Sequence, residues 1–175
     1  MAFLGLDIEV ASKGLRKKRF FAFIIDLLFV LILCNISYWL IGIPNFFAVS
    51  EAMDLAKEAG SNNVELNNSV FSLFNEAYVS MLIIWFIYDV INGIFLKSSL
   101  GKLIFGLKLY FLKEQSQIKD VSMLIVRSSA KFISLYLFQG LPFFICQLTT
   151  LTNRDCQSGF DKLVKMKVDY NDRGK

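Results

Sequence analysis

Four charged side chains of this sequence lie within or at the start of long apolar runs, where they could do chemistry that exposed charges cannot. Asp26 and Asp89 each interrupt an apolar run, and Arg127 and Lys131 stand near the start of a third. A charge in hydrocarbon costs at least about 2.5–3.5 kcal/mol, so such groups pair or line a water-filled path. Two kinds of chemistry follow. The charges form permanent ion pairs between helices, or one acid keeps no permanent partner and binds a cation or a proton.

Helix geometry places these charges at similar depth. Asp26 comes about two helical turns after Arg19, which is roughly 10 Å along a helix that rises 1.5 Å per residue. Asp89 precedes Lys97 by a similar distance, and Arg127 reaches the same depth if its run enters from the same side. We therefore expect Asp26, Asp89 and Arg127 to lie within side-chain reach. The residues predicted to form this charge cluster are Arg19, Asp26, Asp89, Asn92, Arg127 and Lys131.

The composition indicates a membrane protein. The chain is 55% hydrophobic with a mean hydropathy of +0.50, above the roughly 45–50% apolar content of soluble domains. Its net charge of +4 is too small to suggest a nucleic-acid partner. Because the sequence has no histidine, it can hold no Ser-His-Asp or Cys-His catalytic set. We expect no enzyme activity, no metal and no cofactor.

The first predicted membrane helix covers about residues 18–43, because one apolar run there exceeds the roughly 20 residues needed to cross a bilayer. Lysine and arginine residues precede it, and short segments rich in these residues lie on the cytoplasmic side. This predicts a cytoplasmic N-terminus in the cell membrane. A cleaved signal peptide has a similar pattern, but this run is long and contains Asp26.

Residues 44–76 carry more acids than bases and many turn-forming residues, so we predict an outside loop. Ser50 could cap a short helix within it. A second membrane helix is expected over about 77–96, followed by a cytoplasmic loop over 97–121. The lysines that favour this side for the loop are Lys97, Lys102, Lys108, Lys113 and Lys119.

The third apolar region, 122–152, is too long for a simple crossing and too short for two, which need roughly 40 residues. One straight crossing would leave the basic tail, 153–175, outside. A bent or re-entrant helical pair that turns near Gly140 and Pro142 would return the tail to the cytoplasm, and both topologies are open. The expected fold is a single all-α integral membrane domain over residues 1–175, with two transmembrane helices and this third region.

A small cytoplasmic β element is also expected. The tail segment "VKMKVDY" alternates apolar and polar residues, which is typical of a strand, and "LKLYFLK" in the preceding loop is a plausible partner. Pairing of the two strands would bring Asp161 toward Lys102.

Three stretches resemble the RDD family of multi-pass membrane proteins, named for one arginine and two aspartates. "RFFAFIID" resembles the family's opening signature, and "NRDCQSGFDKLVKMKV" its closing stretch, which assigns the second aspartate to Asp161. "SSLGKLIFGLKLY" resembles the Gly-Gln-Thr-Pro-Gly-Lys segment and the Gly-Leu-Arg-Val that follows it. The matching residues there are Gly101, Lys102, Gly106 and Leu107, and Gly101, Lys102 and Asp161 form the predicted cytoplasmic motif.

The resemblance implies transport or ion exchange for some members and supplies no substrate. This sequence departs from the family pattern at three positions: Lys97 replaces a frequent glycine, Phe160 a frequent histidine, and Met166 a common threonine.

Two functions remain open from the sequence. The protein could be a transport or ion-exchange component that uses the acid and base cluster within the membrane. Alternatively, it is a non-catalytic accessory or assembly subunit of a larger membrane complex. A transporter predicts unpaired acids in a hydrated pocket, whereas an accessory subunit predicts fully paired charges. In both cases we expect the lipid bilayer and a homo-oligomer or larger membrane-protein complex as partners.

Overall fold

The computed structural model describes residues 2–58, 64–112, 116–152 and 157–170. Its internal contacts gather in two units. The first consists of Met1–Leu27 with Phe86–Lys175, and the second is Leu28–Trp85. All the charged residues of the predicted cluster and motif belong to the first unit.

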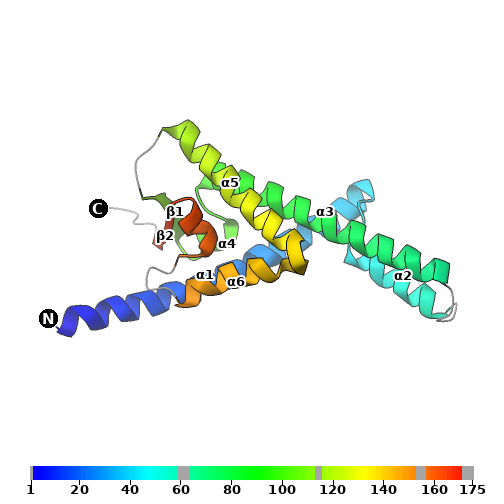
Figure 1. Ribbon diagram of the computed structural model, residues 1–175, viewed down its shortest axis with the longest axis horizontal. Helices are drawn as coiled ribbons and strands as arrows, with labels where there is room; N and C mark the ends of the chain where they lie inside the picture. The colour runs from blue at the N-terminus through cyan, green and yellow to red at the C-terminus, as the bar shows by residue number, and fades with distance from the viewer. Residues whose placement is uncertain (1, 59–63, 113–115, 153–156, 171–175) are drawn as a thin grey trace. The chain divides into compact units, whose positions relative to one another are not determined.

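Two long helices dominate the chain, and both are long and apolar enough to cross a membrane. Helix α1 covers Ala2–Ile41 and α3 covers Val64–Leu96 (Figure 1). The apolar spans within them are Gly14–Ile41 and Glu65–Leu96. Together with shorter helices and one small sheet, they make this an all-α membrane protein, as the sequence predicts.

The predicted start of the first helix, residue 18, is too late. Helix α1 begins sixteen residues earlier, at Ala2, so the helix continues through the basic flank and well beyond it, outside the apolar run. The helix ends at Ile41 because Gly42 adopts a positive φ of 70°. The Gly42 amide then donates to the Tyr38 carbonyl at 2.9 Å, which closes the helix end.

The predicted outside loop, 44–76, is largely helical. It contains α2, Phe46–Glu58, and the first turns of α3, so the predicted start of the second helix at 77 is wrong. Polar residues near Val64 do not prevent a helix, since Leu66, Val70 and Ala77 share one face of it. The predicted second helix therefore lacks the polar first turns of α3, which belong to the same apolar span.

The cap of α2 is Asn45, and the predicted cap, Ser50, lies inside the helix. The Asn45 Oδ1 accepts hydrogen bonds from the amides of Phe47 and Ala48, at 3.0 and 3.1 Å. Its side-chain amide donates to Asn35 Oδ1 at 2.8 Å, which ties the cap to α1 within the second unit. Asparagine caps helices as well as serine does, so a cap at Asn45 agrees with the usual preferences for this position.

Helix α3 ends at Leu96, as predicted, but the following loop, 97–121, is not irregular. It contains the short helix α4, Leu100–Ile104, the strand β1, Leu107–Phe111, and the first turn of α5. The predicted start of the third helical region at 122 is therefore five residues late. Ser116 precedes the helix in an extended conformation and marks its true beginning.

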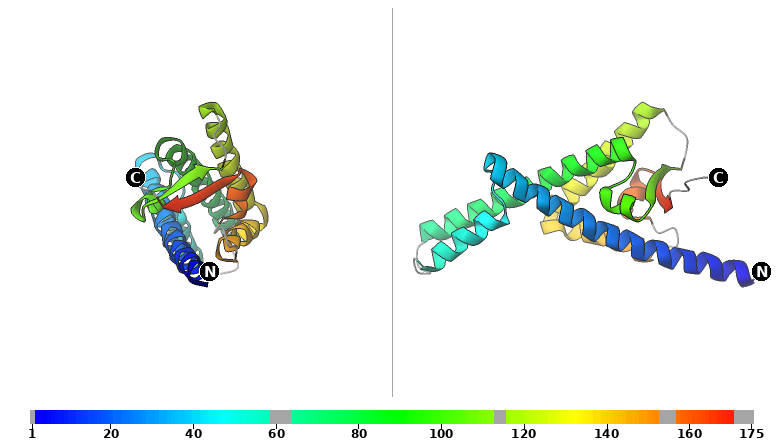
Figure 2. Two further views of the ribbon diagram at one scale, coloured as in Figure 1. Left: turned by 90° about the vertical axis from the view of Figure 1, so that its left-hand side faces the viewer. Right: turned by 180° about the vertical axis from the view of Figure 1, so that it is seen from behind.

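The predicted strand pairing is confirmed. Strand β1 pairs antiparallel with β2, Met166–Tyr170, so that Leu109 lies opposite Val168 and Phe111 opposite Met166 (Figure 2, left). One face of each strand is apolar and buried, as alternation requires. The residues that form the core beneath the sheet are Leu15, Leu107, Leu109, Leu124, Val164, Met166 and Val168.

The third helical region bends at the predicted place. Helix α5, Gln117–Tyr136, is followed by a 3₁₀ turn at Leu137–Gly140 and by α6, Leu141–Thr152. Gly140 has a φ of 88°, which a glycine adopts without strain. The short helix α7, Gly159–Leu163, then packs against both α5 and α6.

The bend returns the chain to the sheet from which it left. Because β1 precedes α5 and β2 follows α6, the strand pairing requires the intervening helices to begin and end beside the same sheet. One straight helix cannot do this. Within the first unit, Phe143 of α6 packs near Phe23 of α1, and Phe132 of α5 near Phe86 of α3.

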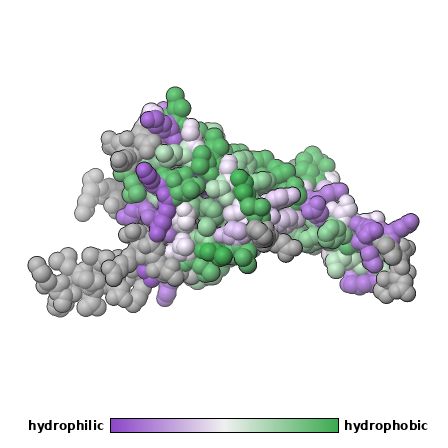
Figure 3. Space-filling view, in the orientation of Figure 1, coloured by the Kyte–Doolittle hydropathy of each residue, from purple (hydrophilic) through white to green (hydrophobic). Residues whose placement is uncertain are grey.

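Hydrophobic side chains gather on the outer surface of α5 and α6 (Figure 3). On α5, Ile125, Val126 and Ile133 are exposed, and on α6, Leu141 and Phe144 are exposed. Such a surface suits lipid or another apolar partner.

Candidate functional site: a buried charge network

The centre of the network is Asp161, whose side chain is completely buried. The Arg19 guanidinium of α1 donates to Asp161 Oδ2 at 2.6 Å, and Arg127 Nε of α5 donates to Oδ1 at 2.9 Å. One carboxylate thus joins two arginines from distant parts of the sequence. Charge-assisted hydrogen bonds of this kind are about twice as strong as neutral ones.

Asp161 is held in place by its own helix. Ser158 caps α7: its hydroxyl accepts from the Asp161 amide, while the Ser158 amide donates to Asp161 Oδ2, both at 3.2 Å. Burial alone would raise the pKa of Asp161, but Arg127, Arg19 and Lys102 more than offset it and hold the pKa well below its usual range. The spacing Ser-x-x-Asp is a recognised capping signature and could have identified Ser158 from the sequence.

Asp89 of α3 forms the second acidic position. Lys131 Nζ donates to both of its oxygens, at 2.7 and 2.9 Å, and the Ser128 hydroxyl donates at 2.6 Å. Arg127 Nη1 lies 3.5 Å from Asp89 Oδ2. The predicted contact between Asp89 and Arg127 is therefore present. Helix α5 supplies all three partners of Asp89, which are Arg127, Ser128 and Lys131.

Arg127 connects the two acidic positions into one chain of alternating charges. The order is Arg19, Asp161, Arg127, Asp89 and Lys131, and it links α1, α7, α5 and α3. All five side chains are buried. Removing one member of such a buried set leaves another charge uncompensated, so the network joins the helices strongly.

Asp26 has a different environment from the other acids. It accepts hydrogen bonds from the Tyr88 hydroxyl at 2.7 Å, the Ser99 hydroxyl at 2.5 Å and the Gly101 amide at 2.8 Å. Among the described residues no ion pair joins Asp26 to a base, so the expected contact with Arg127 is absent. These neutral donors were missed, since no spacing rule in the sequence links them to α1.

Asp26 holds the short helix α4 against α1. Gly101 lies so close to α1 that a Cβ at this position would come 2.1 Å from the Ala22 carbonyl oxygen. Ala22 is itself completely buried. Small residues allow this close approach of two backbones, which explains the glycine of the predicted motif.

Asn92 and Lys102 do not join the chain of ion pairs. The Asn92 side chain donates to the Tyr88 carbonyl of its own helix at 2.8 Å. Lys102 is half-buried, and among the described residues it makes no hydrogen bond or ion pair. Burial and the nearby charges of Arg127 and Lys131 lower the pKa of Lys102 to about 7, against the attraction of Asp161 and Asp26.

Lys102 should therefore give the protein a pH-dependent stability. Its ordinary pKa is 10.5, so between about 7 and 10.5 the unfolded chain binds more protons than the folded chain. Stability contributed by this group then rises as the pH rises through that window. Lys102→Gln should remove this part of the rise, measured as melting temperature in detergent micelles at pH 6.5 and pH 9.

Lys162→Gln is the matched control, because Lys162 is exposed on α7. It should melt with the same pH dependence as the native protein. An equal pH dependence in the Lys102→Gln variant and the native protein would contradict the assigned pKa of Lys102.

The fold and the network together define a helical membrane protein whose apolar helices are joined by buried ion pairs. The RDD family profile matches residues 14–165, so the chain belongs to the RDD family. Comparison with curated proteins and with solved structures gives no match. The arginine and the two aspartates assigned by resemblance are Arg19, Asp26 and Asp161, and Arg19 and Asp161 form a direct ion pair.

The three departures from the family pattern have local explanations. Lys97 adopts a positive φ of 47°, a conformation that glycine takes without strain. Phe160 is buried and its ring lies 5.7 Å from that of Phe143, so it contributes packing where a histidine would bring a polar ring. Met166 is completely buried under the sheet, where a hydroxyl would need a partner.

Proposed function

We propose that this protein is a non-catalytic accessory or assembly subunit of a larger membrane complex. The observation that carries the proposal is that Asp26, Asp89 and Asp161 each accept hydrogen bonds from at least two protein groups. A transported cation would need to displace these donors. The fully satisfied acids support a network that holds helices together and presents apolar surface to a partner.

We infer that the N-terminus and the sheet face the cytoplasm of the cell and that α2 faces outward. The basic flank before the first span supports this orientation. The pairing of β1 with β2 supports it further, because the loop after α3 and the chain after α6 must then share one side of the membrane. The protein would accordingly be a multi-pass protein with a re-entrant third region.

A paired experiment with Asp26→Asn tests the proposal. We expect purified native protein in vesicles to conduct no protons or sodium ions above empty vesicles. In cell membranes, it should migrate on native gels in an assembly well above its mass of 20.0 kDa. Asp26→Asn should weaken three charge-assisted hydrogen bonds, cost about 1–2 kcal/mol of stability and reduce the assembly.

Asp54→Asn, a change at an exposed ion pair of α2, is the control and should leave stability and assembly unchanged. Native protein that conducts ions, with the flux lost in Asp26→Asn at unchanged stability, would replace the accessory role with transport.

Proton-linked ion exchange is the second candidate, and Lys102 favours it. A half-buried lysine with a pKa of about 7 gains and loses a proton under physiological conditions next to the network. In this case Lys102→Met should abolish pH-driven cation flux in vesicles, while the helices remain folded. Flux that persists in this variant would remove Lys102 from the exchange.

A further inference from the structure

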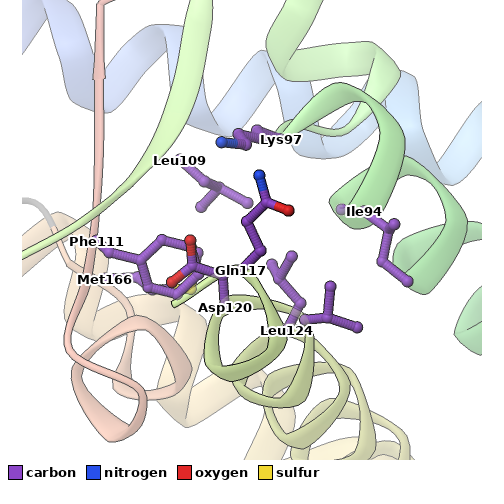
Figure 4. Close-up of a pocket in the computed structure, with 10 residues that line it drawn as sticks. Ile94, Lys97, Leu109, Phe111, Gln117, Asp120, Leu124 and Met166 are labelled. Atoms are coloured by element: carbon purple, nitrogen blue, oxygen red, sulfur yellow. The ribbon is translucent and has the colours of Figure 1, made fainter. Parts of the chain in front are cut away.

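A cavity of about 260 Å³ opens beside the sheet, and none of the described residues that line it is a member of the charge network. It lies between the last turns of α3, strand β1 and the first turns of α5 (Figure 4). Ile94, Leu109, Phe111 and Leu124 give it largely apolar walls. Apolar cavities of about 150 Å³ stay dry and bind molecules such as benzene, so this one has room for an aromatic ring and a short substituent.

Asp120, which lines this cavity, has one carboxylate oxygen with no hydrogen-bond partner in the part of the chain that the structure describes. The Oδ1 atom of Asp120 is buried, and within the described residues nothing donates a hydrogen bond to it. A buried acceptor without a partner is costly, and more so when the group is charged. Figure 4 shows the Asp120 carboxylate beside Phe111, with the Gln117 side chain extending toward Lys97.

The surroundings of Asp120 restrict the chemistry of a ligand. A divalent cation such as calcium takes six to eight oxygen ligands, and the apolar walls do not provide them. A trapped water needs two to four polar partners. Lys97 and Gln117 also line the cavity, so a ligand must bind clear of the Lys97 ammonium. The Asp120 carboxylate next to apolar side chains suits an N–H donor that carries a positive charge and an apolar body.

We propose that this cavity binds a primary ammonium compound, with the ammonium on Asp120 and its apolar part against Leu109, Phe111 and Leu124. The cavity begins beside Ile94, close to the end of the apolar span at Leu96. The ammonium could therefore belong to the headgroup of an aminophospholipid or to a soluble amine, and the chemistry of recognition is the same.

Titration calorimetry of the full chain in detergent micelles tests this, with phenethylamine as the probe. The native protein should bind phenethylamine, and Asp120→Asn should weaken binding at least about tenfold, because a charge-assisted hydrogen bond is lost. 2-Phenylethanol, which has nearly the same shape without the charge, should bind at least about tenfold more weakly to the native protein. Val121→Phe should fill the cavity and also abolish binding while it leaves Asp120 in place.

Asp54→Asn, on α2, serves as the control and should bind phenethylamine as the native protein does. The proposal is overturned if the native protein fails to bind phenethylamine, if 2-phenylethanol binds equally well, or if Asp120→Asn binds with unchanged affinity. Melting temperatures of all variants show whether each is folded. Because Asp120→Asn and Val121→Phe change different positions, the test still works if one of these two variants fails to fold.

Lipid nanodiscs distinguish the two sources of the ammonium. If the aminophospholipid headgroup occupies the cavity, phenethylamine should bind more weakly in nanodiscs with phosphatidylethanolamine than in nanodiscs with phosphatidylcholine alone. Equal affinity in the two would assign the cavity to soluble amines.

Discussion

Replacing Arg127 by methionine should lower the free energy of unfolding by about 3–5 kcal/mol, the usual cost of breaking a buried ion pair from one side. Arg127 donates to Asp161 at 2.9 Å and lies 3.5 Å from Asp89, so its loss affects both acids. Methionine retains much of the apolar stem, and the measured loss then reports the charge. The measurement is equilibrium unfolding in detergent micelles.

An exposed ion pair provides the comparison. Lys57 lies 2.8 Å from Asp54 with both side chains largely exposed, so Lys57→Met should cost at most about 1 kcal/mol. The double variant Arg127→Met with Asp161→Asn should be less stable than Arg127→Met alone, because it also removes the carboxylate to which Arg19 donates at 2.6 Å. An Arg127→Met variant as stable as Lys57→Met would show that the network does not hold the helices together.

The sequence predicts the two long apolar helices and the strand pairing, because each depends on a local period or on composition. Strict alternation in residues 166–170 is enough to recognise β2. The position of the bend follows from Gly140 and Pro142 in the same way. Helix ends are less predictable, since polar turns such as those after Val64 add no hydropathy signal.

The partners of the charged residues are only partly predictable. Matched depth brings Asp89 and Arg127 together correctly, because Asp89 lies about two turns before the end of the regular helix α3 and Arg127 about three turns after the start of the regular helix α5. The same depth argument fails for Asp26, which accepts hydrogen bonds from the Ser99 hydroxyl and the Gly101 amide. These two residues cap and form the short helix α4, which folds back onto α1. Such a contact depends on the path of a loop, and helix geometry carries no information on it.

The two motif aspartates consequently have different roles in the fold. Asp161 neutralises two arginines and joins helices through charge. Asp26 satisfies neutral donors and positions α4, which carries Lys102 beside the network. Two aspartates of the same family motif thus make different contacts, so the match to the motif does not by itself give the role of either one.

The second large effect is expected from Gly101→Ala, which adds a single methyl group. A Cβ at this position would lie 2.1 Å from the Ala22 carbonyl oxygen and 3.0 Å from Asp26 Cγ. The oxygen belongs to the backbone of α1 and cannot turn away, so α4 must move and the 2.8 Å hydrogen bond from Gly101 to Asp26 must lengthen. We expect a loss of about 3 kcal/mol in unfolding free energy in detergent micelles, at the upper end of overpacking costs.

Gly14→Ala is the matched control, because the added methyl there would make only ordinary contact, at 3.6 Å, with the Tyr170 hydroxyl. Since alanine favours a helix over glycine, this variant should be unchanged or more stable by up to about 1 kcal/mol. Adding Ala22→Gly to Gly101→Ala should not restore stability, because the clash is with a main-chain oxygen. A Gly101→Ala variant that melts like the native protein would show that α4 does not lie this close to α1. It would also contradict the role of Asp26 in holding α4 against α1.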